Sequence, residues 1–269
     1  MKPFLKWAGN KYKILDKILP LLPKGDRLIE PFVGAGAVFL NTDYKEYILA
    51  DSNEDLINLY IVISKHKYDF IDFTKTLFTQ ENNTPEMYYK LRDEFNNTKD
   101  GYLKAALFIY LNRHAYNGLC RYNKQGKFNT PFGKYRKPYF PEKELIGFIE
   151  KINKSKTTFL CQDFEKTMMM AQKGDVVYCD PPYVPLSETA NFTDYSSGGF
   201  TQKDQIRLVS ISESISKKGV FVLISNHNTT FTQHYYKNAS KIITFDVRRS
   251  ISCNGKNRSK APEILAVFG

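Results

Sequence analysis

The hydrophobic pattern near the N-terminus predicts one strand–turn–helix–strand unit of a parallel α/β sheet. Residues 27–30 form a short strand-like run around Leu28-Ile29, and the Gly-rich segment 31–36 follows it directly. Residues 37–40 then begin a helical pattern, and the apolar run 47–50 ends at Asp51. A strand, a tight turn, a helix and a second strand within so short a stretch are typical of a βαβ unit.

Strand character in the rest of the chain is interrupted by one long helical stretch. Apolar positions at helical spacing run from residue 56 to residue 112, and residues 118–133 lack periodicity. Helices are also expected at 11–22 and 202–216, and strands at 158–160, 175–179, 220–224, 241–251 and 263–268. The pattern therefore predicts an α/β domain, residues 1–56 and 145–269, with a mainly helical insertion at residues 57–144.

The composition is that of a globular, cytoplasmic protein. The 269 residues are 42% hydrophobic, which is enough for a core and fits one large domain with an insertion. No run approaches the ~18 apolar residues that cross a bilayer, and residues 1–6 contain no apolar signal segment. The cysteines, at 120, 161, 179 and 253, form no CxxC pair, which disfavours a zinc ribbon or a disulfide framework. We expect no membrane partner and no metal.

The charge adds a polyanionic partner to this picture. Lys and Arg number 39 against 28 Asp and Glu, which gives a net charge of +11. Residues 101–141 hold eight basic and ten aromatic side chains and no acidic one. Cations neutralise phosphates and aromatic rings stack on bases, so this segment predicts nucleic-acid contact. The alternative is a solvated basic face over an aromatic core. A second acid-free stretch, residues 247–260, contains the hairpin pair Asn254-Gly255.

The Gly-rich turn predicts a site for a cofactor that contains an adenosine. Phe32 is followed by Gly34 and Gly36, whose lack of side chains lets the backbone approach a ligand closely. Asp51, at the end of the next strand, stands where acidic residues accept hydrogen bonds from ribose hydroxyls. The third glycine of a dinucleotide motif is absent, so a pyrophosphate site is disfavoured. The alternative is that the glycines serve only the turn.

A second motif, Asp180-Pro181-Pro182-Tyr183, directly follows the apolar strand. The two prolines stiffen the segment and lack backbone donors, which leaves carbonyl oxygens to accept hydrogen bonds. Asp180 and the Pro181 carbonyl suit the hydrogens of an exocyclic amine, and Tyr183 offers a flat face to a planar ring. Such an amine is a poor nucleophile until its hydrogens are held, because its lone pair is delocalised. The motif predicts chemistry on a nucleobase amine, with an ordinary Pro-rich turn as the alternative.

Further runs accompany these two motifs in a fixed order. They are FLKWAGNK at 4–11, the segment 30–41, YLNR at 110–113, YNGLCRYN at 116–123, PFG at 131–133, the segment 177–183, ISNH at 224–227 and the segment 247–252. Together they resemble the α group of amino-methyltransferases and, more closely, the bacterial DNA adenine methylase family that acts on GATC. Two departures are Asn10, where glycine is common, and Lys134, where arginine is expected; lysine keeps a phosphate contact but loses the planar fork.

This resemblance implies a Rossmann-like methyltransferase fold, with a seven-stranded, mostly parallel sheet and an inserted target-recognition domain. It implies an enzyme that transfers a methyl group from S-adenosylmethionine to adenine N6 in double-stranded DNA, within GATC, after the base has been flipped out. The residues implied for catalysis are Asp180, Pro181, Pro182 and Tyr183. Those implied for the cofactor are Trp7, Lys11, Phe32, Gly34, Gly36, Asp51, Asp163, Phe164 and Asp180. Residues 185–199 are expected as a mobile loop over the site, and the protein as a monomer.

The basic segment and the resemblance together imply a surface that reads DNA. Arg121 is the expected base contact, because arginine forks onto guanine O6 and N7. Leu119 is expected at a thymine methyl group, and Tyr116 as a wedge in the gap left by the flipped base. Lys6 is expected near a guanine. The other implied DNA contacts, most of them to phosphates, are Arg113, Asn117, Lys124, Pro131, Lys134, Tyr135, Arg136, Lys137 and Asn191.

Other classes are disfavoured by missing motifs. The four histidines and four cysteines do not form the zinc signature of a nucleobase deaminase. A serine hydrolase motif, GxSxG, is absent. An amino-methyltransferase for RNA or for protein glutamine stays open, although the latter typically has Asn in place of Asp180. A non-catalytic DNA-binding module that keeps the fold is the third alternative.

Overall fold

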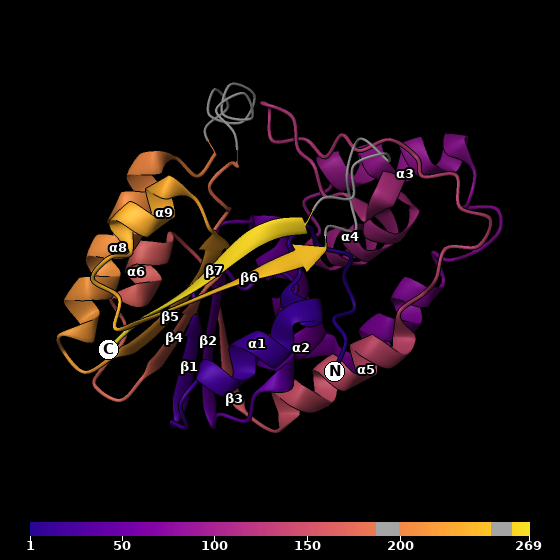
Figure 1. The fold of residues 1–269 in the computed structure, drawn as a ribbon. Coiled ribbons are helices and arrows are strands. Elements are labelled where there is room, and N and C mark those ends of the chain that lie inside the picture. Colours follow the sequence, from indigo (N-terminus) through magenta and orange to yellow (C-terminus); the bar gives the residue numbers. More distant parts are fainter. Residues whose placement is uncertain (187–198, 249–259) are drawn as a thin grey trace. The chain divides into compact units, whose positions relative to one another are not determined.

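The computed structural model describes residues 1–186, 199–248 and 260–269, and these residues form an α/β fold around a seven-stranded, mostly parallel sheet (Figure 1). The strand order is β3-β2-β1-β4-β5-β7-β6. The strands are β1 (Arg27–Glu30), β2 (Glu46–Asp51), β3 (Lys156–Cys161), β4 (Val176–Cys179), β5 (Phe221–His227), β6 (Lys241–Arg248) and β7 (Lys260–Phe268). The predicted fold class is confirmed, and each predicted strand is present; the hairpin pair Asn254-Gly255 lies outside the described residues.

The helices precede, separate and follow these strands. They are α1 (Leu15–Ile18), α2 (Glu54–Lys75), α3 (Pro85–Asn97), α4 (Gly101–His114), α5 (Glu142–Asn153), α6 (Phe164–Met168), α8 (Gln202–Ser216) and α9 (Thr230–Tyr235). No helix in the described ranges is both long enough and apolar enough to cross a bilayer.

Tertiary contacts group the chain into two compact units. The helical unit comprises Met1–Leu19, Val33–Tyr47 and Asp51–Cys161, and the sheet unit comprises Pro20–Phe32, Ile48–Ala50 and Gln162–Gly269. The expected insertion at residues 57–144 stays a prediction.

The sheet unit is built on strands that are buried on both faces. β4 pairs in parallel with β1 and β5, and all four of its residues are at most 2% exposed. Such continuous apolar runs are typical of the centre of a parallel sheet. β7 lies antiparallel between β5 and β6. Helices α6 and α8 pack on each other, and α8 contacts β5 and β7 on one side of these strands (Figure 1).

The helical unit is centred on α4. Its residues 105–114 are all buried, and α4 contacts α2 and α3, while α5 contacts α2 and β3. The long helical stretch predicted over residues 56–112 is therefore three helices. Thr84 caps α3, which starts with Pro85, and the carboxylate of Asp100 caps α4 by accepting from the Tyr102 and Leu103 amides. Cap residues inside a continuous apolar pattern thus set the helix boundaries.

The helix predicted to begin after the Gly turn is a single 3₁₀ turn, Phe39–Asn41. Side chains compete for the carbonyls that would continue it. The Asn41 amide donates to the Ala37 carbonyl at 2.8 Å, and the Thr42 hydroxyl donates to the Val38 carbonyl at 3.0 Å. The connection between β1 and β2 is therefore short and contains this 3₁₀ turn instead of a full crossover helix.

The helix predicted at residues 11–22 is also broken. The structure has a 3₁₀ turn at Lys11–Ile14, the short α1, and a second 3₁₀ turn at Leu19–Leu21. Pro20 lacks the backbone donor that a longer helix needs at this place.

Candidate active site

The Gly turn of the helical unit is held against an indole ring and a carboxylate. Gly34 has φ of +45°, and a Cβ atom added to it would lie 2.9 Å from Trp7 Nε1. Its amide donates to Asp51 Oδ2 at 3.1 Å, and the Tyr60 hydroxyl donates to its carbonyl oxygen at 2.5 Å. Gly36 has φ of +69°. The sequence-predicted residues Trp7, Gly34 and Asp51 therefore lie together, and glycine is required at position 34 by both conformation and space.

Asp51 carries a carboxylate that burial destabilises and backbone amides stabilise. Burial raises its pKa above the usual value, and hydrogen bonds from the amides of Asn53, Gly34 and Ser52 act in the opposite direction. The Asn53 amide donates to Oδ1 at 3.0 Å. The carboxylate is thus fixed at the end of β2, and its tendency to take up a proton exceeds that of an exposed aspartate.

Lys11 is a mostly buried cation in the same N-terminal segment, with 6% of its surface exposed. Its ammonium group donates to the Gly9 carbonyl at 2.6 Å. The departure at Asn10 has a local role, since its side chain accepts from the Tyr12 amide at 2.9 Å and caps the 3₁₀ turn.

In the sheet unit, the Asp-Pro-Pro-Tyr motif leaves β4 and is held by side chains from α8 and β5. The Gln205 amide donates to the Pro182 carbonyl at 2.7 Å, and the Val184 amide donates to Asn226 Oδ1 at 2.9 Å. His227 Nδ1 lies 2.7 Å from the Val184 carbonyl oxygen. Asn226 is fully buried, and its amide nitrogen lies 3.0 Å from Gln205 Oε1. The backbone is therefore fixed on both sides of Tyr183.

Tyr183 itself is half-buried between polar neighbours. Its hydroxyl donates to Glu263 Oε2 at 3.3 Å, and its ring meets the His227 ring edge to face at 4.7 Å. Burial and the nearby carboxylates of Asp180 and Glu263 raise its pKa well above that of an ordinary tyrosine. The ring is thus a neutral phenol at any working pH.

Two aromatic rings and an arginine surround Phe164 at the start of α6. Phe32 stacks on Phe164 at 5.3 Å, and Phe200 meets both rings. The Arg207 guanidinium lies 4.5 Å from the Phe164 ring centre and 2.8 Å from Asp163 Oδ2. The predicted cofactor residues Phe32, Asp163 and Phe164 thus share one corner of the sheet unit, where Arg207 contacts Asp163 and Phe164.

The segment implied to read DNA presents most of its polar groups to solvent. Tyr116 is 54% exposed, and Leu119 and Tyr135 are half-buried. The exposed members of the predicted set are Asn117, Arg121, Lys124, Pro131, Lys134, Arg136 and Lys137. Bridges between Ala115 and Phe132, and between Tyr122 and Phe128, close the segment into a compact loop. Asn191 lies outside the described residues.

Arg121 is pre-positioned at the edge of this loop. Its Nε donates to Asn129 Oδ1 at 2.8 Å, and a terminal nitrogen donates to the Asn129 carbonyl at 3.3 Å. The Asn129 amide in turn donates to the Arg121 carbonyl at 2.9 Å. The guanidinium is therefore exposed but oriented, as a side chain that contacts a base edge requires.

Arg113 is buried, unlike the exposed members of the predicted DNA-contact set. It is 8% exposed, its guanidinium donates to the Phe4 carbonyl, and it lies over the Tyr139 ring. A buried guanidinium with these partners anchors the N-terminal segment, and this placement does not favour a phosphate contact.

Lys6 is tied to the loop by Asn112, a fully buried residue of α4. Asn112 Oδ1 accepts from the Lys6 amide at 2.9 Å, and its Nδ2 donates to the Lys6 carbonyl at 2.7 Å. The Lys6 side chain packs on Gly118 and lies 4.4 Å from the Tyr135 ring centre. Burial, and then the charge of Arg113, lower the pKa of Lys6.

Several of these supporting residues were not predicted from the sequence, namely Asn112, Asn129, Phe200, Gln205, Arg207, Asn226, His227 and Glu263. Asn112, Asn226 and His227 belong to the runs YLNR and ISNH, so the resemblance marked them without giving them a role. The others follow no motif, and only the fold brings them to the site.

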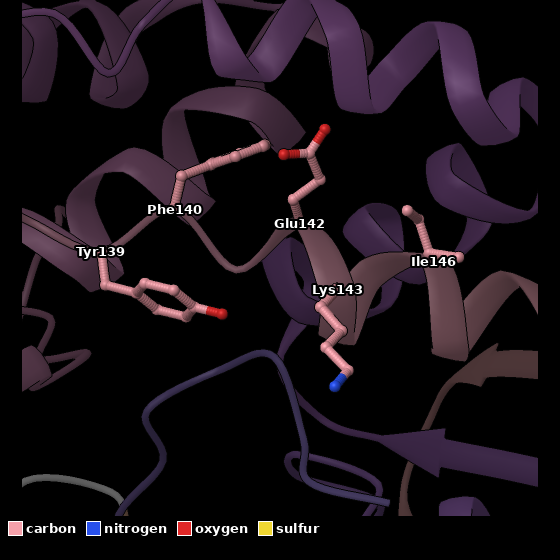
Figure 2. A pocket seen from close by; sticks show the side chains of 5 residues that line it. All are labelled: Tyr139, Phe140, Glu142, Lys143 and Ile146. Carbon is pink, nitrogen blue, oxygen red and sulfur yellow. The ribbon is translucent and has the colours of Figure 1, made fainter.

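One pocket in the described structure holds none of the predicted site residues. Its volume is ≈ 350 Å³, and it is an open hollow at the start of α5 in the helical unit (Figure 2). Its lining residues are Tyr139, Phe140, Glu142, Lys143 and Ile146. Its open form and mixed lining give it no specific ligand chemistry.

A seven-stranded α/β sheet with Asp-Pro-Pro-Tyr after β4 defines a methyltransferase that acts on an amino group. Residues 7–251 match the family described as D12 class N6 adenine-specific DNA methyltransferase. The chain belongs to this family, whose methyl donor is S-adenosylmethionine.

Curated relatives agree with this assignment. The chain is 51% identical over 267 residues to the DNA adenine methylase of Escherichia coli (strain K12). The alignment covers 99% of this chain and 95% of that protein. It is 53% identical over 268 residues to the DNA adenine methylase of Serratia marcescens, with 99% and 98% covered. The corresponding enzyme of Vibrio cholerae serotype O1 is 49% identical over 268 residues, with 99% and 96% covered. The expected enzyme class and cofactor are confirmed.

Proposed function

We propose that this adenine-specific DNA methyltransferase modifies N6 of the adenine in GATC, after flipping that base out of the duplex. The observation that carries the proposal is the way Gln205, Asn226 and His227 fix the backbone around Tyr183. A rigid acceptor pair beside a flat ring suits an unstacked base that must be held in one orientation. The resemblance of YNGLCRYN at residues 116–123 supports GATC as the target.

The residues present fit S-adenosylmethionine. The fixed Asp51 carboxylate suits a ribose diol, and the stacked pair Phe32–Phe164 offers aromatic faces for an adenine ring, with Asp163 beside it. The remaining proposed cofactor contacts are Trp7, Lys11, Gly34, Gly36 and Asp180. The cofactor, when bound, supplies a methyl group on a positively charged sulfur, and the protein supplies binding and orientation.

The chemistry then depends on Asp180 and the Pro181 carbonyl. Both accept the hydrogens of the adenine N6 amino group, which directs its lone pair toward the methyl carbon. Positive charge develops on N6 during the transfer, and the Asp180 carboxylate stabilises it electrostatically. Pro182 keeps the segment stiff, and Tyr183 stacks on the flipped ring as a neutral phenol. The new N6–C bond forms as the bond between the methyl carbon and the donor sulfur breaks, which leaves the sulfur uncharged. The proton that N6 then loses passes to water.

In the DNA-reading loop, Arg121 is proposed to contact a guanine in the major groove, and Leu119 a thymine methyl group. The exposed ring of Tyr116 is proposed to fill the gap left by the flipped base, next to Asn117. Lys6 is proposed near a second guanine. The proposed backbone contacts are Lys124, Pro131, Lys134, Tyr135, Arg136 and Lys137, together with Asn191.

The test measures methyl transfer from labelled S-adenosylmethionine to a GATC duplex and to a scrambled duplex of equal composition. We expect label on the GATC duplex only, recovered as N6-methyladenine after digestion. A duplex with 2-aminopurine in place of the target adenine should gain fluorescence on binding, because the unstacked base is no longer quenched. Equal labelling of both duplexes would contradict GATC specificity, and unchanged fluorescence would contradict base flipping.

The raised pKa of Asp51 predicts a pH dependence of cofactor binding. Protonation removes the charge that accepts from ribose hydroxyls, so affinity for S-adenosylmethionine should fall with falling pH, and at a higher pH than an ordinary aspartate would give. Asp51→Asn should weaken binding by roughly 10- to 150-fold at neutral pH and remove this dependence. Calorimetric titrations over a pH series, with the fold checked by circular dichroism, measure both effects.

The matched control is Asp43→Asn in the same unit, since the Asp43 side chain is fully exposed and pairs with Lys151 at 3.5 Å. It should bind the cofactor like the wild type at each pH. A pH-independent affinity in the wild type would contradict the role given to Asp51.

A further inference from the structure

The turn that holds Asp51 continues directly into the first turn of α2. Asp51 accepts from the Gly34 amide on one side and from the Asn53 amide on the other. Asn53 caps α2, because its side chain accepts from the Leu56 amide at 3.0 Å. The Gly turn and the start of the helix are therefore joined through the Asp51 carboxylate.

Asp55, in that first helical turn, is the acceptor for a side chain from the DNA-reading loop. The Tyr122 hydroxyl donates to Asp55 Oδ2 at 2.7 Å, and Lys104 Nζ of α4 lies 2.9 Å from Asp55 Oδ1. The Asp55 side chain is only 13% exposed. Burial and the neighbouring Asp55 raise the pKa of Tyr122 far above its usual value, so its hydroxyl stays protonated and keeps donating.

Tyr122 is the direct neighbour of Arg121 at the base of the loop. It is bridged to Phe128, and the next residue, Asn129, holds the Arg121 side chain from the opposite side of the loop. The Tyr122 ring and the Arg121 side chain are therefore held at the same part of the loop.

We propose that the Tyr122–Asp55 hydrogen bond couples the cofactor turn to the DNA-reading loop, so that S-adenosylmethionine and specific DNA tighten each other's binding. The link runs from Gly34 and Asp51 through the capped start of α2 to Tyr122 and then to Arg121, entirely within the helical unit. Tyr122 acts as a positioning residue, because it lies on the link between Asp51 and Arg121 and is not itself proposed to touch the cofactor or the DNA. The inference rests on the proposed roles of Asp51 and Arg121.

Coupling of this kind is reciprocal, so one ratio measures it: the dissociation constant of the cofactor without DNA divided by that with DNA. The dissociation constant of S-adenosylhomocysteine, which cannot transfer a methyl group, is measured with the protein alone and with saturating unmethylated GATC duplex. We expect the duplex to tighten binding by at least about fivefold in the wild type, and Tyr122→Phe to bring the ratio within about twofold of one. The phenylalanine keeps the ring contact with Phe128 at 5.7 Å and removes only the hydroxyl.

The matched control is Tyr139→Phe. The Tyr139 hydroxyl also donates to a carboxylate of the same unit, Glu144, at 2.8 Å, but its ring is 55% exposed at the edge of the hollow before α5 (Figure 2). This variant should keep the wild-type ratio. Thermal unfolding of both variants establishes that the fold is intact.

A ratio of one in the wild type would overturn the coupling, and so would an unchanged ratio in Tyr122→Phe. An equal loss in Tyr139→Phe would overturn it as well, because the effect would then belong to any lost hydroxyl. The ratio is also measured with the scrambled duplex. Equal methylation of both duplexes would contradict the GATC proposal but not the coupling. The coupling ratio can still be measured with any duplex that the enzyme methylates.

Discussion

Replacing Asp180 with asparagine should lower kcat for methyl transfer by roughly 10²- to 10³-fold and weaken S-adenosylmethionine binding far less, because Asp180 is only one of several proposed cofactor contacts. The amide keeps the shape of the side chain and one acceptor oxygen, but it loses the negative charge that faces the developing charge on N6. It also brings two donors toward an amino group that itself donates. Single-turnover rates with labelled cofactor and a GATC duplex, alongside binding of S-adenosylhomocysteine, separate the chemical step from binding.

The control for this variant is Asp246→Asn, which alters an exposed carboxylate on β6 of the same unit. Its rate should match the wild type. A single-turnover rate within a few-fold of the wild type in Asp180→Asn would remove Asp180 from the mechanism, and the Pro181 carbonyl would then have to act without it.

Arg121→Ala should relax discrimination at one guanine of GATC by about 1–3 kcal/mol, which is roughly 5- to 150-fold in the ratio of cognate to substituted sites. The reason is that a guanidinium already oriented by Asn129 delivers two donors to one base edge, and alanine delivers none. The measurement compares kcat/KM for GATC with kcat/KM for duplexes that carry one substitution at each position.

Lys124→Ala provides the comparison, because Lys124 is an exposed cation of the same loop. It should weaken binding to all sequences alike and reduce the slope of affinity against salt by about one. If Arg121→Ala behaves in this way too, Arg121 is a phosphate contact and the guanine is read by another side chain.

The central strands were predictable because they are short apolar runs that the sheet buries, and burial is what the hydrophobic pattern records. The edge strands β3 and β6 are only partly covered, and alternation rather than a continuous apolar run marks them. The boundaries of the helices were less predictable. Asp100 and Thr84 end one helical stretch and begin the next through single side-chain caps, which barely disturb the apolar spacing. After the Gly turn, Asn41 and Thr42 take carbonyls that helix propensity alone would leave to the backbone.

At the site, the sequence identified residues that a motif keeps adjacent, such as Asp180 and Tyr183. It did not identify Gln205 or Glu263, because each comes to the motif from a distant element and has no spacing rule. Arg113 shows the opposite limit. A basic residue in a basic segment predicts a phosphate contact, whereas the fold buries its guanidinium against the Phe4 carbonyl.

The strand order at one edge of the sheet constrains how the chain is made. β7 is synthesised after β5 and β6 but lies between them, and within the described residues β6 is paired with β7 alone. During translation β6 therefore has no strand to join until residues 260–268 have emerged, and this edge assembles after the parallel centre. A ribosome that stalls or a frameshift before residue 260 would leave an unpaired edge strand beside a nearly complete sheet, which is an aggregation-prone intermediate.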